Sequence, residues 1–233
     1  MIKICALLLA LCLALAVTPA QAGERPIVVE LFTSEGCSSC PPADALLAEL
    51  AGRPDVLALS LHVDYWDRLG WKDPYSSHAA TDRQNRYATL LALPSIYTPQ
   101  IVVDGRWQAV GSDRADVERA LELARRDRPE IPVTLALDHG QAQIALGPGG
   151  GGVAASVLLI GFDRRHVTAV KRGENSGRTL AHVDVVRGVE EIARLSAGEI
   201  AVQIPWSCDR VAAVVQAADG RVLGVAVRDA EPL

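Results

Sequence analysis

Two cysteines separated by two serines, Cys37 and Cys40 in the motif GCSSCPP, are the residues of this chain best suited to chemistry. An apolar run at residues 27–32 precedes them, and apolar residues at helical spacing follow over residues 41–52. The thiols are therefore expected at a helix N-terminus, where unpaired backbone N–H groups and the helix dipole favour the thiolate. A thiolate attacks disulfides and binds metals, so the motif indicates thiol–disulfide exchange or a pair of metal ligands. A permanently closed structural disulfide is the third alternative, although so short a ring constrains little chain entropy.

Other residues could contribute to such a site. Glu30 lies within the first apolar run, where a carboxylate is costly unless it is paired, protonated or on a solvent-facing side of the strand. His62, Asp64 and Trp66 lie at the end of the next apolar run, at the sheet edge where α/β proteins place their sites. With His78 and the two thiols, these polar residues could form a copper or zinc site. We favour a core role for His62 and a packed loop for the aromatic residues that follow it. The alternative is that the Trp66–Trp71 loop lines a partner groove, and Trp66 is our substrate-binding candidate on that basis. We assign no metal ligand and no cofactor.

The spacing of apolar and turn residues predicts the elements that position these side chains. A second strand over residues 56–63 would complete a parallel strand–helix–strand unit. After it we expect a helix from His78 to about Ala92 capped by Ser76 or Ser77, a hairpin of residues 100–103 and 106–110 turning at Asp104-Gly105, and a helix over residues 113–126 capped by Ser112. Short β runs separated by turn signals follow, and they predict an antiparallel, sandwich-like β domain. The boundary is placed at residues 128–131.

The N-terminus has a short basic start, an uncharged apolar run and an Ala-x-Ala ending at Ala22. This pattern predicts a cleaved signal peptide over residues 1–22 and a periplasmic or secreted protein. Lipoprotein attachment through Cys12 is the less favoured alternative. Cleavage would leave a first domain of residues 23–128 and a β-rich domain of residues 129–233. No later apolar segment is long enough to span a bilayer, so we expect no stable membrane insertion.

The chain carries 23 Lys and Arg against 28 Asp and Glu, a formal net charge of −5, and it has no basic run. Nucleic acid is therefore not an expected partner. Cys208 is the odd thiol that remains after signal cleavage. By default it is an inert buried cysteine, and the alternatives are that it resolves a mixed disulfide or links two chains.

The order strand, CxxC, helix, strand, helix, and proline before a hairpin resembles the thioredoxin-like fold. That fold places a cis-proline loop opposite the CxxC, and Thr98-Pro99 stands in the corresponding position. The resemblance implies a cis peptide at Pro99 and substrate binding at Thr98 and Pro99. It also implies that Cys37 attacks, that Cys40 resolves and that Glu30 relays protons to the resolving thiol. Because no Trp precedes the first cysteine and two serines separate the pair, the direction of electron flow stays open.

Four runs of sequence resemble, in order, a family of secreted bacterial proteins known as domain of unknown function twelve twenty-three (DUF1223). The runs are VVELFTSEGCSSCPPAD, LHVDYWDRLGWKDPYSS, YTPQIVVDG and GENSGRTLAHVDVVR, and the last, with His182 and Asp184, defines no reaction by itself. The resemblance implies an α/β thioredoxin-like domain followed by an antiparallel β-rich part. We therefore predict thiol–disulfide exchange with protein thiols or disulfides through Cys37 and Cys40. The alternative is a non-catalytic thioredoxin-fold module that binds copper, zinc or a polypeptide.

Overall fold

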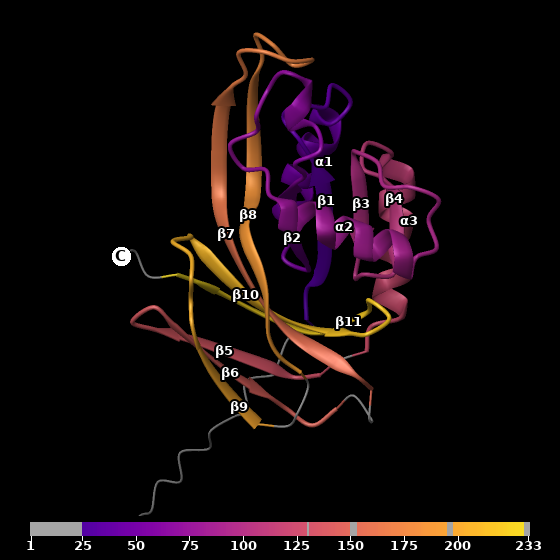
Figure 1. Cartoon of the computed structure of the whole chain (residues 1–233). Coiled ribbons are helices and arrows are strands. Elements are labelled where there is room, and N and C mark those ends of the chain that lie inside the picture. The colour runs from indigo at the N-terminus through magenta and orange to yellow at the C-terminus, as the bar shows by residue number, and fades with distance from the viewer. Residues whose placement is uncertain (1–24, 130, 150–152, 195–197, 231–233) are drawn as a thin grey trace, which may run out of the picture.

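The computed structural model describes residues 25–129, 131–149, 153–194 and 198–230 (Figure 1). The predicted signal peptide, residues 1–22, lies outside the described residues. In chain order the elements are β1 (Ile27–Thr33), α1 (Pro41–Ala51), β2 (Val56–His62), the 3-10 helix η1 (Asp67–Leu69), α2 (His78–Leu90), β3 (Gln100–Val103), β4 (Trp107–Val110), α3 (Arg114–Arg126), β5 (Val133–Asp138), β6 (Gln141–Leu146), β7 (Ala155–Ala169), β8 (Thr179–Arg194), β9 (Gly198–Gln203), β10 (Arg210–Ala217) and β11 (Val222–Asp229). Within the described ranges, no helix has the length and apolar character needed to cross a membrane.

Eight strands form one mixed sheet in the order β11-β10-β7-β8-β2-β1-β3-β4. Strand β1 pairs in parallel with β2 and antiparallel with β3, which confirms the predicted strand–helix–strand unit. Strand β8 joins β2 in parallel through Val185 and Ser60. The predicted division at residues 128–131 falls between α3 and β5, yet the C-terminal strands continue the sheet of the N-terminal part across it.

The other three strands, β5, β6 and β9, form a separate antiparallel sheet. Its Leu135 and Ile144 share an apolar core with Val157 of β7 and with Val211 and Val215 of β10. The C-terminal part is therefore β-rich, with two packed layers as predicted. One of these two layers is shared with the α/β part, which the sequence did not indicate.

Strand β1 is buried on both faces, and its alternating side chains enter two different cores. Val29 and Leu31 pack with α1 and α3. Val28 and Phe32 lie on the other face and pack with α2. This alternation decides which side chains of β1 can meet the helix that carries the cysteines.

The predicted cap of α2 and the predicted turn of the β3–β4 hairpin are confirmed. Ser77 caps α2, and both central residues of the Asp104-Gly105 turn have the positive φ that a type I′ turn requires, 47° and 66°. The predicted cap of α3 was wrong. Asp113, not Ser112, accepts the backbone N–H three residues further along at 3.1 Å, because the helix begins one residue later than expected.

Candidate functional site

The CSSC motif forms the turn between β1 and α1, and its two cysteines are joined in a disulfide with their Cα atoms 5.5 Å apart. Cys40 is the capping residue of α1, and prolines occupy the first two helical positions, where a missing N–H is tolerated. The Sγ atom of Cys37 lies 3.3 Å from Ser39 Oγ. Ser38 and Ser39 are exposed, but both cysteines are fully buried at 0 % exposure. The disulfide thus stands at a helix N-terminus, as predicted, while being closed off from solvent.

The residues predicted to bind substrate lie beside the motif. The Thr98-Pro99 peptide is cis, as predicted, and Trp66 Nε1 donates a hydrogen bond to Thr98 Oγ1 at 2.8 Å. Two glycines allow close packing here. A Cβ on Gly36 would lie 3.1 Å from Trp66 Cβ, and a Cβ on Gly111 would lie 3.2 Å from Pro99 Cβ and 3.0 Å from a side chain of α1. The structure therefore brings Trp66, Thr98 and Pro99 together with the CSSC turn.

Glu30, the predicted proton relay, faces away from the cysteines. It is 1 % exposed, and its carboxylate accepts hydrogen bonds from Nε and Nη2 of Arg83 and, at 2.5 Å, from the Tyr87 hydroxyl. Burial alone would lower the pKa of Arg83, but the Glu30 carboxylate outweighs this effect and raises it. The reason is strand alternation, since α1 packs on the opposite face against Val29 and Leu31. The ion pair with Arg83 offsets the free-energy cost of burying the Glu30 carboxylate. The position of Glu30 does not support a role in relaying protons to Cys40.

Three acids and two histidines are buried together next to the CSSC turn, and we call this group the acid–histidine cluster (Glu35, Asp44, His62, Asp73 and His182). Asp44 lies one helical turn after Cys40, so the two side chains share a face of α1. Its Oδ1 accepts a hydrogen bond from the Thr33 hydroxyl at 2.9 Å, and its Oδ2 lies 3.9 Å from His182 Nδ1. His182 Nε2 lies 3.3 Å from Oε1 of Glu35, the residue that directly precedes the GCSSC run.

His62 and Asp73 complete the cluster. His62 Nδ1 lies 2.6 Å from Asp73 Oδ2, and the same oxygen accepts the backbone N–H of Glu35 at 2.8 Å. The rings of His62 and His182 meet edge to face with centroids 4.6 Å apart, and Trp71 Nε1 donates to Glu35 Oε2 at 2.7 Å. His62 Nε2 and His182 Nδ1 are buried with no hydrogen-bond partner in the part of the chain that the structure describes.

Burial and opposing charges set the protonation of the cluster. Burial raises the pKa of Asp44, and the attraction of His182 and His62 offsets this only in part. Burial would also raise the pKa of Asp73 and lower that of His62. Their mutual attraction outweighs burial, so that the pKa of Asp73 is lowered and that of His62 is raised. The cluster therefore holds one ion pair, His62 with Asp73, and one carboxyl group, Asp44, whose pKa is raised.

The C-terminal strands supply part of this site. Strand β8 carries His182, and Figure 1 shows β7 and β8 running together to a hairpin tip near α1. At this tip, Asn175 Nδ2 donates hydrogen bonds to the carbonyl oxygens of Glu35 at 2.9 Å and Cys37 at 2.8 Å. Glu174 Oε2 accepts the backbone N–H of Ser38 at 3.1 Å. Residues on both sides of the predicted domain boundary thus form one site.

The structure does not bring all of the residues considered as metal ligands together. His62 is buried and paired with Asp73, as expected for a core histidine. Asp64 Oδ2 and His78 Nδ1 lie 3.1 Å apart at the exposed start of α2. Among the described residues, no group of three or more His, Cys, Asp or Glu side chains is arranged to hold a metal ion.

Comparison with known proteins identifies the family. The model of the family described as "Protein of unknown function (DUF1223)" matches residues 28–225. The chain belongs to this family. A crystal structure of a protein from Agrobacterium tumefaciens is 31 % identical, with 88 % of this chain and 94 % of that chain covered and a TM-score of 0.75. HBP35 of Porphyromonas gingivalis is 14 % identical over 90 % of this chain and 77 % of that chain, and its TM-score of 0.62 shows a likeness of fold alone. The search of curated proteins gave no significant match.

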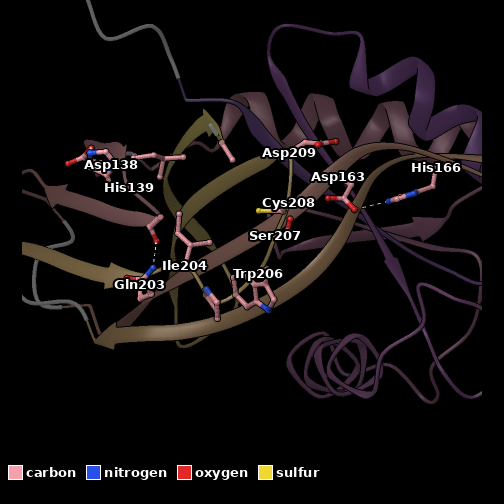
Figure 2. Close-up of a pocket in the computed structure, with 14 residues that line it drawn as sticks. Asp138, His139, Asp163, His166, Gln203, Ile204, Trp206, Ser207, Cys208 and Asp209 are labelled. Carbon is pink, nitrogen blue, oxygen red and sulfur yellow. Dashed lines mark hydrogen bonds and ion pairs between the residues drawn. The ribbon is translucent and has the colours of Figure 1, made fainter. Parts of the chain in front are cut away.

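In this DUF1223 chain, a cavity of about 880 Å³ lies beside Cys208 rather than at the CSSC motif (Figure 2). A Cβ on Gly161 of β7 would lie 3.1 Å from Cys208 Sγ. The hairpin tip begins after Val170, roughly 30 Å further along at the usual rise of a strand. Cys208 therefore cannot resolve a mixed disulfide at Cys37 of the same chain. Burial raises the pKa of the Cys208 thiol, but the residue is half-buried rather than the buried cysteine that we favoured.

Sequence reasoning missed four residues of the site, Glu35, Asp44, Asp73 and Asn175, and gave no role to His182. All five lie within the runs that carry the DUF1223 resemblance, so a signal for them was present. The sequence runs could not show which of these residues contact one another. The contact between His182 and Glu35 spans 147 residues of sequence.

Proposed function

We propose that this DUF1223 chain is a thioredoxin-like thiol–disulfide oxidoreductase that acts on protein thiols or disulfides in the periplasm or outside the cell. The observation that carries the proposal is the Cys37–Cys40 disulfide at the start of α1, with Asp44 one turn further along the same helix. Backbone N–H groups and the helix dipole stabilise a thiolate at this position. The predicted signal peptide, residues 1–22, supports an oxidising compartment.

Oxidation of a substrate begins when its thiolate attacks Sγ of Cys37. The bond to Cys40 breaks, Cys40 leaves as a thiolate with the electron pair, and protonated Asp44 returns a proton to it. The substrate's second thiolate then attacks the substrate sulfur of the mixed disulfide and releases Cys37 as a thiolate. The substrate leaves as a disulfide, and the protein has gained two electrons. Reduction of a substrate follows the same steps in reverse, with Asp44 accepting the proton of Cys40.

A polypeptide substrate is proposed because of the residues beside the disulfide. Trp66 is half-buried and offers an apolar face next to Gly36. Its Nε1 is already bonded to Thr98 Oγ1, so the indole is held in place beside the Thr98-Pro99 backbone. An extended segment can pair with such a backbone edge while an apolar side chain contacts the indole.

Insulin reduction and the refolding of scrambled ribonuclease test the proposal, because the first measures disulfide reduction and the second measures disulfide rearrangement, which has no net electron flow. We expect turnover in at least one assay for the wild-type chain and for Cys208→Ser, which changes the thiol distant from the site. Cys37→Ser should abolish it, since the attacking sulfur is lost. The absence of Cys37-dependent turnover in both assays would refute the enzymatic function.

A second candidate function is the binding of copper or zinc without turnover. It is favoured by two buried imidazole nitrogens, His62 Nε2 and His182 Nδ1, which have no hydrogen-bond partner among the described residues. Reduction of the disulfide would add the thiolates of Cys37 and Cys40, and thiolate with imidazole suits both metals. Stoichiometric metal in the reduced protein, an equal loss of titratable thiols and no turnover in either assay would favour this candidate.

A further inference from the structure

The tip of the β7–β8 hairpin, residues 171–178, lies against the CSSC turn and has a single buried side chain. Asn175 is 0 % exposed, whereas the other residues of the tip are exposed. Its Nδ2 donates to the Glu35 and Cys37 carbonyl oxygens, and its Oδ1 accepts a hydrogen bond from Arg178 Nη1 at 3.0 Å. Both hydrogen bonds that the buried Asn175 amide donates therefore go to backbone carbonyl groups at and next to the attacking cysteine.

The closed site leaves no path to the sulfur atoms. A thiolate must approach Cys37 Sγ along the line of the S–S bond, and both cysteines are fully buried. Exchange at this disulfide therefore requires that a covering element moves. The tip is suited to this movement, because its contacts to the CSSC turn are polar: two from Asn175 and one from Glu174 to the Ser38 N–H.

The tip is also built to move as a unit. Val170 and Arg178 close it through a backbone hydrogen bond at 2.9 Å, and the Ser176 hydroxyl donates to the Lys171 carbonyl within it. Beyond the tip, Leu180 and His182 of β8 are buried and hold the strand against the rest of the site. Movement of the tip would therefore leave the acid–histidine cluster in place.

We propose that residues 171–178 form a cap over the Cys37–Cys40 disulfide and that Asn175 is the residue that holds the cap closed. The cap sets how often the disulfide is open to thiols, and so it controls the rate of exchange in both directions. This inference concerns the same site as the proposed oxidoreductase function. It concerns the accessibility of the disulfide, however, and so it can be tested on chemical reduction whether or not the protein turns over a substrate.

Asn175→Ala tests the cap, with Ser176→Ala as the matched control because the Ser176 hydroxyl bonds only within the tip. The measurements are the rate constants for reduction of the disulfide by dithiothreitol and for its reoxidation by oxidised dithiothreitol, together with the midpoint potential. Each lost hydrogen bond changes an equilibrium about fivefold, so removing two should raise both rate constants on the order of 10- to 30-fold. The midpoint potential should stay unchanged, because a cap affects forward and reverse steps equally.

Three results would contradict the proposal that residues 171–178 form a cap. They are unchanged rate constants in Asn175→Ala, an equal acceleration in Ser176→Ala, and a shift in potential with acceleration in one direction alone, which would mean that Asn175 stabilises one redox state. If Asn175→Ala does not fold, Glu174→Gln replaces it, because it weakens the exposed contact to the Ser38 N–H at little structural cost. A charged acceptor bonds about twice as strongly as a neutral one, so Glu174→Gln should accelerate both directions by about two- to fivefold. Unchanged rates in that variant would likewise refute the cap.

Discussion

Replacing Asp44 with Asn tests the proposed proton partner of Cys40. Asn has nearly the shape of Asp and keeps an oxygen that can accept the Thr33 hydroxyl, so the change removes proton exchange with little change in packing. General acid–base catalysis contributes about 100- to 10,000-fold, and a thiol ionises more readily than the hydroxyl groups that such catalysis often serves. We therefore expect Asp44→Asn to slow the attack of Cys40 on the mixed disulfide by about 10- to 100-fold near neutral pH. This effect lies at or below the lower end of the range for general acid–base catalysis.

The pH profile of this step gives a second measure of the role of Asp44. Burial raises the pKa of Asp44, so its carboxyl group titrates closer to neutral pH than an exposed aspartic acid. The carboxylate form accepts the proton of Cys40, and the wild-type rate should therefore rise as the pH increases through that pKa. In Asp44→Asn this rise should vanish, leaving only the rise that follows ionisation of the cysteine thiol.

An aromatic disulfide that releases a coloured thiolate separates the two cysteine reactions. Mixed with reduced protein, it releases one coloured thiolate when Cys37 attacks and a second when Cys40 resolves the mixed disulfide. Asp44→Asn should slow the second release and leave the first unchanged. Glu30→Gln is the comparison variant, because Glu30 is a buried acid on the opposite sheet face, and it should keep the wild-type rate of the second release. An unchanged second release in Asp44→Asn, or a slowed one in Glu30→Gln alone, would refute the reasoning.

Two further predictions concern the buried ion pairs. Arg83→Leu leaves the Glu30 carboxylate buried with the Tyr87 hydroxyl, and should lower the free energy of unfolding in urea by about 3–5 kcal/mol. Adding Glu30→Gln should restore part of this loss, and a double variant no more stable than Arg83→Leu would contradict the argument. The stability from the His62–Asp73 pair is lost as the pH falls through the lowered pKa of Asp73, and is lost again as the pH rises through the raised pKa of His62. Asp73→Asn should therefore flatten both limbs of the curve of thermal stability against pH, whereas a curve of wild-type shape would show that the pair contributes nothing.

The centre of the site could be predicted because its signals are local. A strand, a CxxC and an apolar helix follow one another within residues 27–52, and each has a sequence pattern of its own. Trp66 could be placed near the cysteines because it follows the second strand, at the sheet edge where α/β proteins place their sites. Thr98-Pro99 was placed there by the resemblance to the thioredoxin-like fold. The hydrogen bond between Trp66 and Thr98 and the packing of Gly36 on Trp66 agree with that placement.

Glu30 shows where such reasoning fails. Side chains of a strand alternate between two faces, so a position displaced by one residue points to the opposite core. Apolar residues flank Glu30 on both sides, and so the pattern of a doubly buried strand could not reveal its face. Asp44 was missed for a different reason, since an acid in the first turn of a helix usually serves only the helix dipole. His182 and Asn175 depend on the parallel bridge between β8 and β2, which no local pattern encodes.

The acid–histidine cluster links the C-terminal strands to the proposed redox site, because β8 supplies His182. Burial raises the pKa of Asp44, and so favours the protonated carboxyl group more than in an exposed aspartic acid. In the proposed mechanism, Asp44 supplies this proton to Cys40 from one helical turn away. When Cys40 leaves as a thiolate and takes this proton, the negative charge moves to a carboxylate that faces His182. Because β8 supplies His182, the proposed proton transfer from Asp44 would draw on both halves of the chain.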